Sequence, residues 1–267
     1  MAQKTYAVTG VASGIGAELA RILHGEGHRV IGFDVVATEP GDSSGVDRFI
    51  TLDLSDPGAI VQAADHLNEP LDGLCNNAGL PPRDGLEAAI LEVNFTGTRA
   101  FTNALLPRFR DGGSVVNMAS RAGHGWPANI DQVKALGRLK TRDDITAFIA
   151  SEGIDATRAY NLSKEAVILW TLAEAEPMVN RGLRVNSLSP GGIATGILDD
   201  FRRAFGDKMA KNVARAGRPG EPVEIAHIAA FLLSPASNWI KGTDIAIDGG
   251  MGAFNQTDAM GLDQMRL

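Results

Sequence analysis

The sequence has little of several things that define other classes of protein. One cysteine, Cys75, among 267 residues cannot form an internal disulfide, which is typical of a chain that works in a reducing cytoplasm. No apolar run approaches the ~18 residues that a membrane span needs. The first six residues lead directly into a strand-like pattern and leave no room for a signal peptide. These absences predict a cytoplasmic protein without a membrane span.

Basic residues are also in deficit. The chain has 25 Lys and Arg against 32 Asp and Glu, which gives a formal net charge of −7. Nucleic acids and anionic membrane surfaces attract clustered Lys and Arg, so neither is expected as a partner. The five histidines show no metal-ligand spacing such as His-Glu-x-x-His, and no catalytic metal is expected. The contents of hydrophobic residues (44%) and charged residues (21%) are ordinary, which excludes a disordered or fibrous chain.

Strand-like and helix-like segments alternate along the chain. Seven short runs of apolar, often β-branched residues lie at 6–9, 29–33, 48–52, 73–75, 114–118, 183–188 and 244–247. Helical periodicity fills 16–26, 57–67, 86–109, 160–180 and 222–233. This alternation predicts an α/β fold: a single Rossmann-type, doubly wound parallel sheet of about seven strands with helices on both faces. No repeat or linker interrupts it, so one domain is expected over 1–267.

The loop between the first strand and the first helix is rich in glycine and reads GVASGIG. Glycine permits a tight turn in which backbone N–H groups approach a pyrophosphate, and the helix N-terminus adds a positive dipole end. Asp34 ends the second strand, close to the spacing of about 20 residues at which such folds place a ribose-binding acid. The pattern predicts a dinucleotide site. Its loop residues are Gly10, Ser13, Gly14, Ile15 and Gly16.

Asp34 also favours NAD over NADP. A carboxylate accepts hydrogen bonds from both adenosine ribose hydroxyls, but it repels a 2′-phosphate. Neither residues 11–13 nor residues 35–36 include an Arg or Lys that would neutralise such a phosphate. NAD is therefore the predicted cofactor.

Tyr160 and Lys164 lie four positions apart in a helical segment and therefore share one helix face. A phenol has a pKa of about 10 and is a poor base at neutral pH. A nearby ammonium and a nicotinium ring would stabilise the phenolate and lower that pKa. A Tyr-x-x-x-Lys match is also common on amphipathic helix surfaces, so the pair gains meaning from the motifs around it.

Taken together, the motifs resemble those of the short-chain dehydrogenase/reductase family. The resemblance runs from Thr9 to Gly250. The motifs are, in chain order, TGxxxGxG from Thr9, NNAG from Asn76, Asn94, Ser120, Tyr160-x-x-x-Lys164, Pro190-Gly191 with Thr195, and DGG from Asp248. The order and spacing of this set are highly specific.

The resemblance implies a role for each of four residues. Tyr160 would be the acid and base on the substrate oxygen, and Lys164 would lower its pKa and hold the nicotinamide ribose. Ser120 would hydrogen bond the substrate oxygen, and Asn94 would organise a water relay behind Lys164. Two plainer readings stay open: Ser120 as a helix or turn cap, and Asn94 as a helix residue satisfied by backbone.

The resemblance also implies contacts to the cofactor. Asp53 and Leu54 would lie beside the adenine, although Asp53 also suits a helix N-cap. The remaining contacts would come from Asn76, Ala78, Gly79, Pro190, Gly191, Ile193 and Thr195.

The chain between Ser120 and Tyr160 is far longer than in typical members of the family. In this it resembles the bacterial 3α-hydroxysteroid dehydrogenase/carbonyl reductase group, which includes proteins similar to coniferyl alcohol dehydrogenase. Residues 124–159 are predicted to form an ordered helical insertion. Thr141 and Asp144 have capping-box spacing, Gly153 suits a helix end, and a shorter helix is expected over 130–139.

The expected substrate is a small apolar alcohol or ketone that carries a ring. The segments 80–85, 121–126 and 192–205 are expected to form the pocket walls, and they are largely apolar. A steroid and an aromatic phenylpropanoid alcohol both suit such walls, and Trp126 could face a ring. The sequence thus predicts an NAD-dependent alcohol dehydrogenase or carbonyl reductase. A non-catalytic NAD-binding regulator and an NAD-dependent epimerase or dehydratase are the alternatives.

A homodimer is the expected assembly. In the family, the helices of Asn94 and Tyr160 commonly form one subunit interface, and a bulky insertion next to Tyr160 would obstruct it. The helix over 222–233 and the strand over 244–247 form the other common interface, which the insertion leaves free. A homotetramer is the second possibility.

Overall fold

The computed structural model describes residues 2–36, 45–194, 196 and 198–265. Its seven strands form one sheet in the order β3-β2-β1-β4-β5-β6-β7, and every neighbouring pair is parallel. The strands are β1 (Thr5–Thr9), β2 (Arg29–Asp34), β3 (Arg48–Thr51), β4 (Leu71–Asn76), β5 (Phe109–Met118), β6 (Arg184–Pro190) and β7 (Asp244–Ile247). The strand order reverses between β1 and β4, which creates a crevice at their carboxyl ends. The predicted seven-stranded, doubly wound sheet is confirmed.

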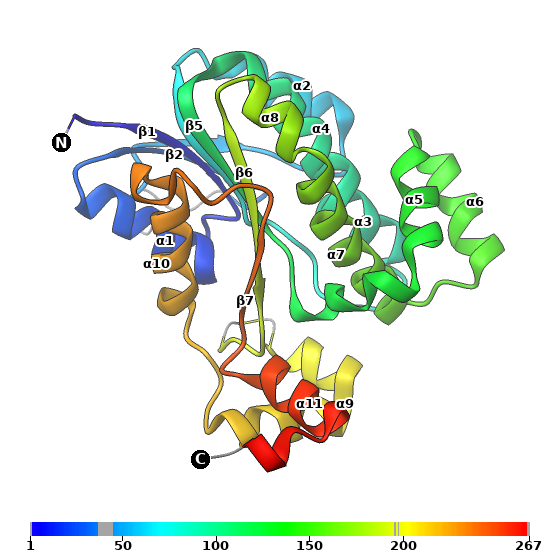
Figure 1. The fold of residues 1–267 in the computed structure, drawn as a ribbon. Coiled ribbons are helices and arrows are strands. Elements are labelled where there is room, and N and C mark those ends of the chain that lie inside the picture. Colours follow the sequence, from blue (N-terminus) through cyan, green and yellow to red (C-terminus); the bar gives the residue numbers. More distant parts are fainter. Residues whose placement is uncertain (1, 37–44, 195, 197, 266–267) are drawn as a thin grey trace.

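Helices cover both faces of the sheet (Figure 1). One face carries α1 (Gly14–Gly25) and α10 (Pro222–Leu233), and the other carries α2 (Pro57–His66), α4 (Thr98–Leu105), α7 (Ala156–Ala173) and α8 (Ala175–Asn180). Alternation along β1 supplies both cores, because successive side chains of a strand point to opposite faces. Tyr6 and Val8 pack under α1 and α10, whereas Ala7 packs on the opposite side.

The helix expected over 86–109 is interrupted, and the prediction that it reaches residue 109 was wrong. The chain forms α3 (Glu87–Leu91), a π-helical stretch η1 (Glu92–Gly97), α4 and a 3-10 turn η2 (Leu106–Arg108), and Phe109 already belongs to β5. Thr98 Oγ1 donates to Val93 O at 2.8 Å, five residues back. Gly97 also passes so close to Leu54 O that a Cβ would lie only 1.8 Å from it. The wider turn is compatible with this close approach, which apolar periodicity does not reveal.

The insertion folds as predicted into helices. It comprises η3 (Arg121–Ala128), α5 (Ile130–Arg138) and α6 (Arg142–Glu152), and α5 and α6 stand beside α7 (Figure 1). Thr141 and Asp144 form a capping box, and Gly153 ends α6 with a φ of 62°. The helix that carries Tyr160 begins earlier than expected, at Ala156, because Asp155 caps it by accepting from Arg158 N.

Two buried acids fasten the insertion to the rest of the protein. Glu92 accepts two hydrogen bonds from Arg142, at 2.8 and 2.6 Å. Glu165 of α7 accepts from Asn129, which follows η3, at 2.9 Å, and it also accepts from Arg158 of its own helix at 2.9 and 2.6 Å. Such two-pronged charged contacts hold an orientation as well as a distance.

Two further helices pack together beyond the carboxyl end of β7 (Figure 1). They are α9 (Leu198–Ala216), which Gly206 interrupts with a φ of 51°, and α11 (Met251–Met260). A 3-10 turn, η5 (Leu262–Met265), follows α11, and another, η4 (Pro235–Ser237), follows α10 and accepts from Arg184 at the start of β6. Within the described ranges, no helix combines the length and apolar character that crossing a membrane requires.

Candidate active site

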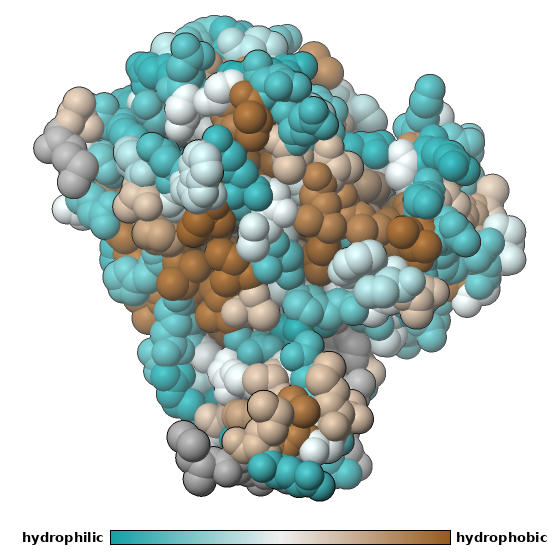
Figure 2. Space-filling model, in the orientation of Figure 1, coloured by the Kyte–Doolittle hydropathy of each residue, from teal (hydrophilic) through white to brown (hydrophobic). Residues whose placement is uncertain are grey.

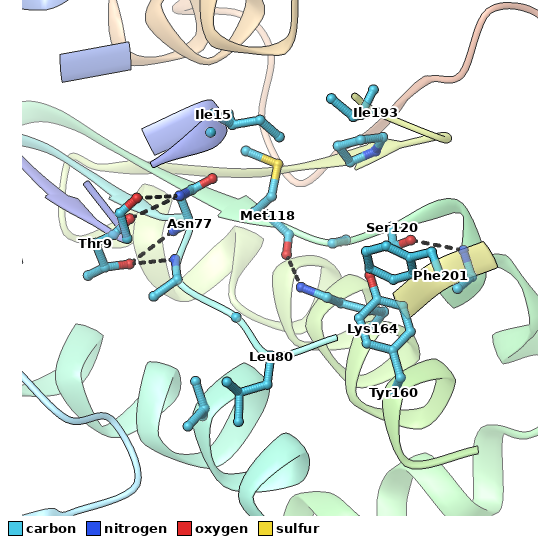
Figure 3. A pocket seen from close by; sticks show the side chains of 18 of the residues that line it. Thr9, Ile15, Asn77, Leu80, Met118, Ser120, Tyr160, Lys164, Ile193 and Phe201 are labelled. Carbon is cyan, nitrogen blue, oxygen red and sulfur yellow. Dashed lines mark hydrogen bonds between the residues drawn. The ribbon is translucent and has the colours of Figure 1, made fainter. Parts of the chain in front are cut away.

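A cavity of about 970 Å³ opens at the carboxyl ends of the strands. One end is bounded by the loops after β1, β2 and β3, and the other by η3, α7, α9 and α11. Figure 3 shows Thr9, Ile15 and Asn77 toward one side of it and Ser120, Tyr160 and Phe201 toward the other. The crevice at the strand reversal is thus a real cavity, placed where doubly wound folds bind their ligands.

The glycine-rich loop is compressed against the loop after β4. Gly10 has a φ of 73°, and a Cβ there would lie 2.8 Å from Asn77 Nδ2. A Cβ on Gly16 would lie 2.1 Å from Gly10 O. Ser13, the N-cap of α1, makes no side-chain hydrogen bond to the helix, and Gly14 lines the cavity beside it. The helix N-terminus is therefore presented to the cavity, which fits the pyrophosphate of a dinucleotide.

Two acids lie at this end. Asp34 Oδ2 accepts from Ala12 N at 3.0 Å, so the carboxylate is held against the glycine-rich loop. Asp53 Oδ1 accepts from the backbone N and the hydroxyl of Ser55, at 2.8 and 2.7 Å. Both acids line the cavity. The alternative reading of Asp53 as the helix cap is wrong, because Asp56 caps α2 by accepting from Gly58 N.

At the other end of the cavity, α7 places Tyr160 and Lys164 beside Ser120 (Figure 3). Lys164 Nζ donates to Met118 O at 2.8 Å and lies 5.8 Å from the centroid of the Tyr160 ring. Phe201 of α9 packs edge-on against the same ring, with 5.1 Å between the centroids. Ser120 Oγ accepts from Ala122 N at 3.2 Å. Ser120 therefore caps η3 and also faces Tyr160.

Burial is the largest influence on the pKa values of Tyr160 and Lys164. It raises the pKa of Tyr160 to about 12, although a hydrogen bond with Ser120 acts to lower that pKa. Burial also lowers the pKa of Lys164 to about 8. The protein without a bound cofactor therefore does not show the expected lowering of the Tyr160 pKa. An additional positive charge in the cavity is what would favour the phenolate.

Asn94 lies in η1, behind the cavity wall. Its Oδ1 accepts from Leu80 N at 2.7 Å, and its Nδ2 donates to Leu80 O and to Ser163 Oγ, both at 3.1 Å. A Cβ added to Gly79 would lie 3.1 Å from Asn94 Oδ1 and 3.5 Å from Lys164 Nζ. Asn94 thus ties the loop after β4 to α7, and the missing side chain at Gly79 leaves room next to Lys164.

Most of the residues predicted for the site line the same cavity. They are Gly10, Ser13, Gly14, Ile15, Asp34, Asp53, Leu54, Ala78, Gly79, Ser120, Tyr160, Lys164, Pro190, Gly191 and Ile193. Gly16 and Asn76 do not line it, and Thr195 lies outside the described residues. Asn76 instead donates to Thr102 and Asn117, each at 2.8 Å, in a buried network.

Sequence reasoning missed other lining residues. Asn77, next to the predicted Asn76, donates to Thr9 O and Gly10 O at 3.1 and 3.2 Å, and the NNAG motif was the available signal. Met251 and Asn255 of α11 also line the cavity, and no pattern marked them.

Three further residues lie away from the lining. Trp126 is partly buried and packs against the core cluster beside α7, and His124 Nε2 lies 3.0 Å from Asp244 Oδ2. The Cys75 thiol is buried in β4, and burial raises its pKa to about 12, which is typical of an inert thiol.

Comparison with known proteins gives consistent matches. A family model described as short chain dehydrogenase matches residues 4–130, and one described as enoyl-(acyl carrier protein) reductase matches residues 144–252. Coniferyl-alcohol dehydrogenase of Pseudomonas sp. (strain HR199 / DSM 7063) is 36% identical over 94% of this chain and 97% of its own length. The 3-alpha-hydroxysteroid dehydrogenase/carbonyl reductase of Comamonas testosteroni is 30% identical over 92% and 95%.

A solved structure agrees with these relatives. The 3-alpha-hydroxysteroid dehydrogenase from Pseudomonas sp. B-0831, complexed with NADH, matches with a TM-score of 0.81 and 30% identity over 95% of this chain and 98% of its own. The fold and the cavity define a dinucleotide-binding α/β protein. The chain belongs to the short-chain dehydrogenase/reductase family. It is therefore an oxidoreductase of a family that uses a nicotinamide cofactor.

Proposed function

We propose that the protein is an NAD-dependent alcohol dehydrogenase or carbonyl reductase that acts on apolar substrates carrying a ring. One observation carries the proposal: Tyr160, Lys164 and Ser120 meet at one end of the cavity whose other end holds the glycine-rich loop and Asp34. The relatives named for coniferyl alcohol and for 3-alpha-hydroxysteroids support this substrate class.

The nicotinamide supplies the hydride chemistry when it is bound, and the side chains manage the proton and the geometry. In alcohol oxidation Tyr160 Oη takes the hydroxyl proton, and in ketone reduction it returns a proton to the carbonyl oxygen. The Ser120 hydroxyl holds the same substrate oxygen. Lys164, whose pKa is about 8, is still mostly protonated at neutral pH. Its ammonium would favour the Tyr160 phenolate and would hold the cofactor ribose, and Asn94 would order a water relay behind it.

The choice of NAD over NADP rests on Asp34. Its carboxylate lines the cavity and is held by Ala12 N. A negative charge in this position would repel a 2′-phosphate. We expect Asp34→Ala to weaken NAD binding and to relax discrimination against NADP, because ribose hydrogen bonds and phosphate repulsion are lost together. Titration of both cofactors by fluorescence measures this. A wild-type protein that prefers NADP contradicts the assignment.

Apolar side chains support the proposed substrate class. Leu80, Ile193, Phe201 and Met251 line the cavity from four separate segments. A fluorescence screen for NADH formation with cyclic, aromatic and steroidal alcohols tests the proposal. Formation of NADH that depends on one of these alcohols is expected. Turnover confined to charged or sugar-like alcohols would overturn the substrate class, and NAD binding without turnover of any alcohol would favour a regulator.

For assembly, we propose a homodimer through α10 and β7. Phe231 of α10 is 40% exposed, and Trp239, just before β7, is 94% exposed. Hydrophobic atoms gather over α10 and alongside β7 (Figure 2). The α5 and α6 helices stand beside α7, where the competing interface would form (Figure 1). A homotetramer is the second candidate. We further propose that residues 1–267 act as one catalytic domain in the cytoplasm.

A further inference from the structure

One polar side chain of the cavity has no part in the mechanism above. Asn161 follows Tyr160 on α7 and lines the cavity. Among the described residues, the buried side-chain atoms without a hydrogen-bond partner belong to Asn76, Asn161, Trp170 and Arg184, and of these four residues Asn161 alone lines the cavity. The unpartnered atom is the carbonyl oxygen Oδ1. A buried acceptor without a donor costs free energy, and beside a cavity a ligand can supply the donor.

The position of Asn161 on α7 shows which part of the cavity it serves. Asn161 and Glu165 are four residues apart and share a helix face. Glu165 Oε1 accepts from Asn129 of the insertion, and a Cβ on Gly125 would lie 3.0 Å from it. This face of α7 is therefore turned toward η3. Ala122 and Gly125 of η3 line the same cavity, so Asn161 lies on the insertion side, away from the glycine-rich loop.

The polar groups nearby already have partners. Arg121 Nε lies 2.9 Å from Asp248 Oδ2, and Ser120 is engaged with η3 and with Tyr160. Phe201, which packs against the Tyr160 ring, supplies an apolar ring to the lining. A hydroxyl group that enters this part of the cavity would find an acceptor in Asn161 Oδ1.

We infer that Asn161 is a specificity-determining residue whose Oδ1 accepts a hydrogen bond from a second hydroxyl of the substrate, away from the oxygen that reacts at Tyr160. The preferred substrates are then ring-bearing alcohols with an additional hydroxyl, such as a phenolic one. The inference rests on the proposed function and narrows its substrate class. A site built to pair a substrate hydroxyl discriminates against the analogue that lacks it, because its own polar group is then left unpaired.

The test uses two matched pairs of alcohols: cinnamyl and 4-hydroxycinnamyl alcohol, and cyclohexanol and 1,4-cyclohexanediol. Wild-type kcat/KM is expected to favour the hydroxylated member of at least one pair by about tenfold or more. Asn161→Leu keeps the branched shape and removes the acceptor, and Asn161→Ala removes both, so the ratio should fall toward one in either variant. Asn161→Asp keeps an acceptor and should retain the preference. NAD binding should be unchanged in all three.

The outcomes separate the inference from the proposed function. If the wild type oxidises both members of each pair with equal kcat/KM, the inference is wrong and the proposed function stands. An equal loss for both members in the Leu and Ala variants would indicate a merely structural role and would also overturn the inference. If the wild type oxidises none of these four alcohols and no other alcohol of the wider cyclic, aromatic and steroidal screen, the proposed substrate class fails, and the inference fails with it.

Discussion

Three of the four residues proposed for the reaction are held by backbone partners. Lys164 donates to Met118 O, Ser120 accepts from Ala122 N, and Asn94 bonds to both the N–H and the carbonyl oxygen of Leu80. Such bonds fix positions before any ligand arrives, which is the condition for efficient proton transfer in a closed site. The same packing buries the Lys164 ammonium in the cofactor-free protein, which costs folding free energy.

That ammonium should leave a signature in the pH dependence of stability. The pKa of Lys164 falls from 10.5 to about 8 on folding, so between these values the unfolded chain holds a proton that the folded protein has released. Wild-type stability therefore rises with pH through this window, and the buried charge destabilises the fold below pH 8. Relative to Lys164→Met, the wild type should gain about 2–3 kcal/mol between pH 7 and pH 10.

Urea unfolding of both proteins without cofactor, at several pH values, measures the effect. The hydrogen bond to Met118 O that Lys164→Met loses shifts the difference by a constant amount, so only its change with pH is diagnostic. Measurements stay at or below pH 10, because burial raises the pKa of Tyr160 to about 12 and adds an opposite trend above that pH. A difference that stays flat from pH 7 to pH 10 would contradict the burial of a charged Lys164.

At the scale of elements, the insertion depends on its own capping as well as on its contacts. Thr141 Oγ1 accepts from Asp144 N at 3.1 Å and starts α6. Thr141→Ala should lower the local opening free energy of α6 by about 1 kcal/mol, because a helix loses its N-cap. Hydrogen exchange over 142–152 measures it. Thr146→Ala, an exposed change within the same helix, is the control and should not weaken α6; equal effects of the two variants would show that the cap is unimportant.

The elements differ in how far they could be predicted. The strands and both insertion helices follow from apolar runs, caps and glycines whose physics is local, and the structure confirms them. The π-helical stretch over 92–97 could not be predicted, because apolar periodicity does not reveal the close approach of Gly97 to Leu54 O that accompanies it. The early start of α7 depends on Asp155, a cap that the pattern around Tyr160 concealed.

Some residues of the candidate site could be predicted from the sequence and others could not. Residues that end strands or open helices, such as Ser13, Asp34 and Ser120, could be placed because parallel strands bring their carboxyl ends to one edge. Asn255 and Met251 could not, because their place depends on how α11 packs after the last strand. Asn76 and Asn77 are adjacent with opposite orientations, and only the structure shows which one reaches the cavity.

At the scale of the whole molecule, α10 and α7 are the two candidate faces for the dimer interface, and one substitution on each distinguishes them. The Phe231 side chain on α10 is 40% exposed in the single chain. Phe231→Glu should convert a dimer to monomers, because an unpaired charge is costly in an interface. Leu172→Glu is the matched control on α7, where the side chain is 42% exposed, and it should leave the dimer intact. Light scattering after size-exclusion chromatography gives the mass. Dissociation by Leu172→Glu but not by Phe231→Glu would show that the interface lies on α7.

Tyr160→Phe tests whether Tyr160 performs the proton transfer in a nicotinamide-dependent reaction. The variant keeps the ring that packs against Phe201 and loses only the hydroxyl. With an alcohol that the wild type oxidises, NADH formation by the variant should fall by about 10²–10⁴-fold or more, the contribution of general acid–base catalysis. NAD binding, titrated in parallel, should be nearly unchanged. Near-normal turnover in the variant would contradict the account.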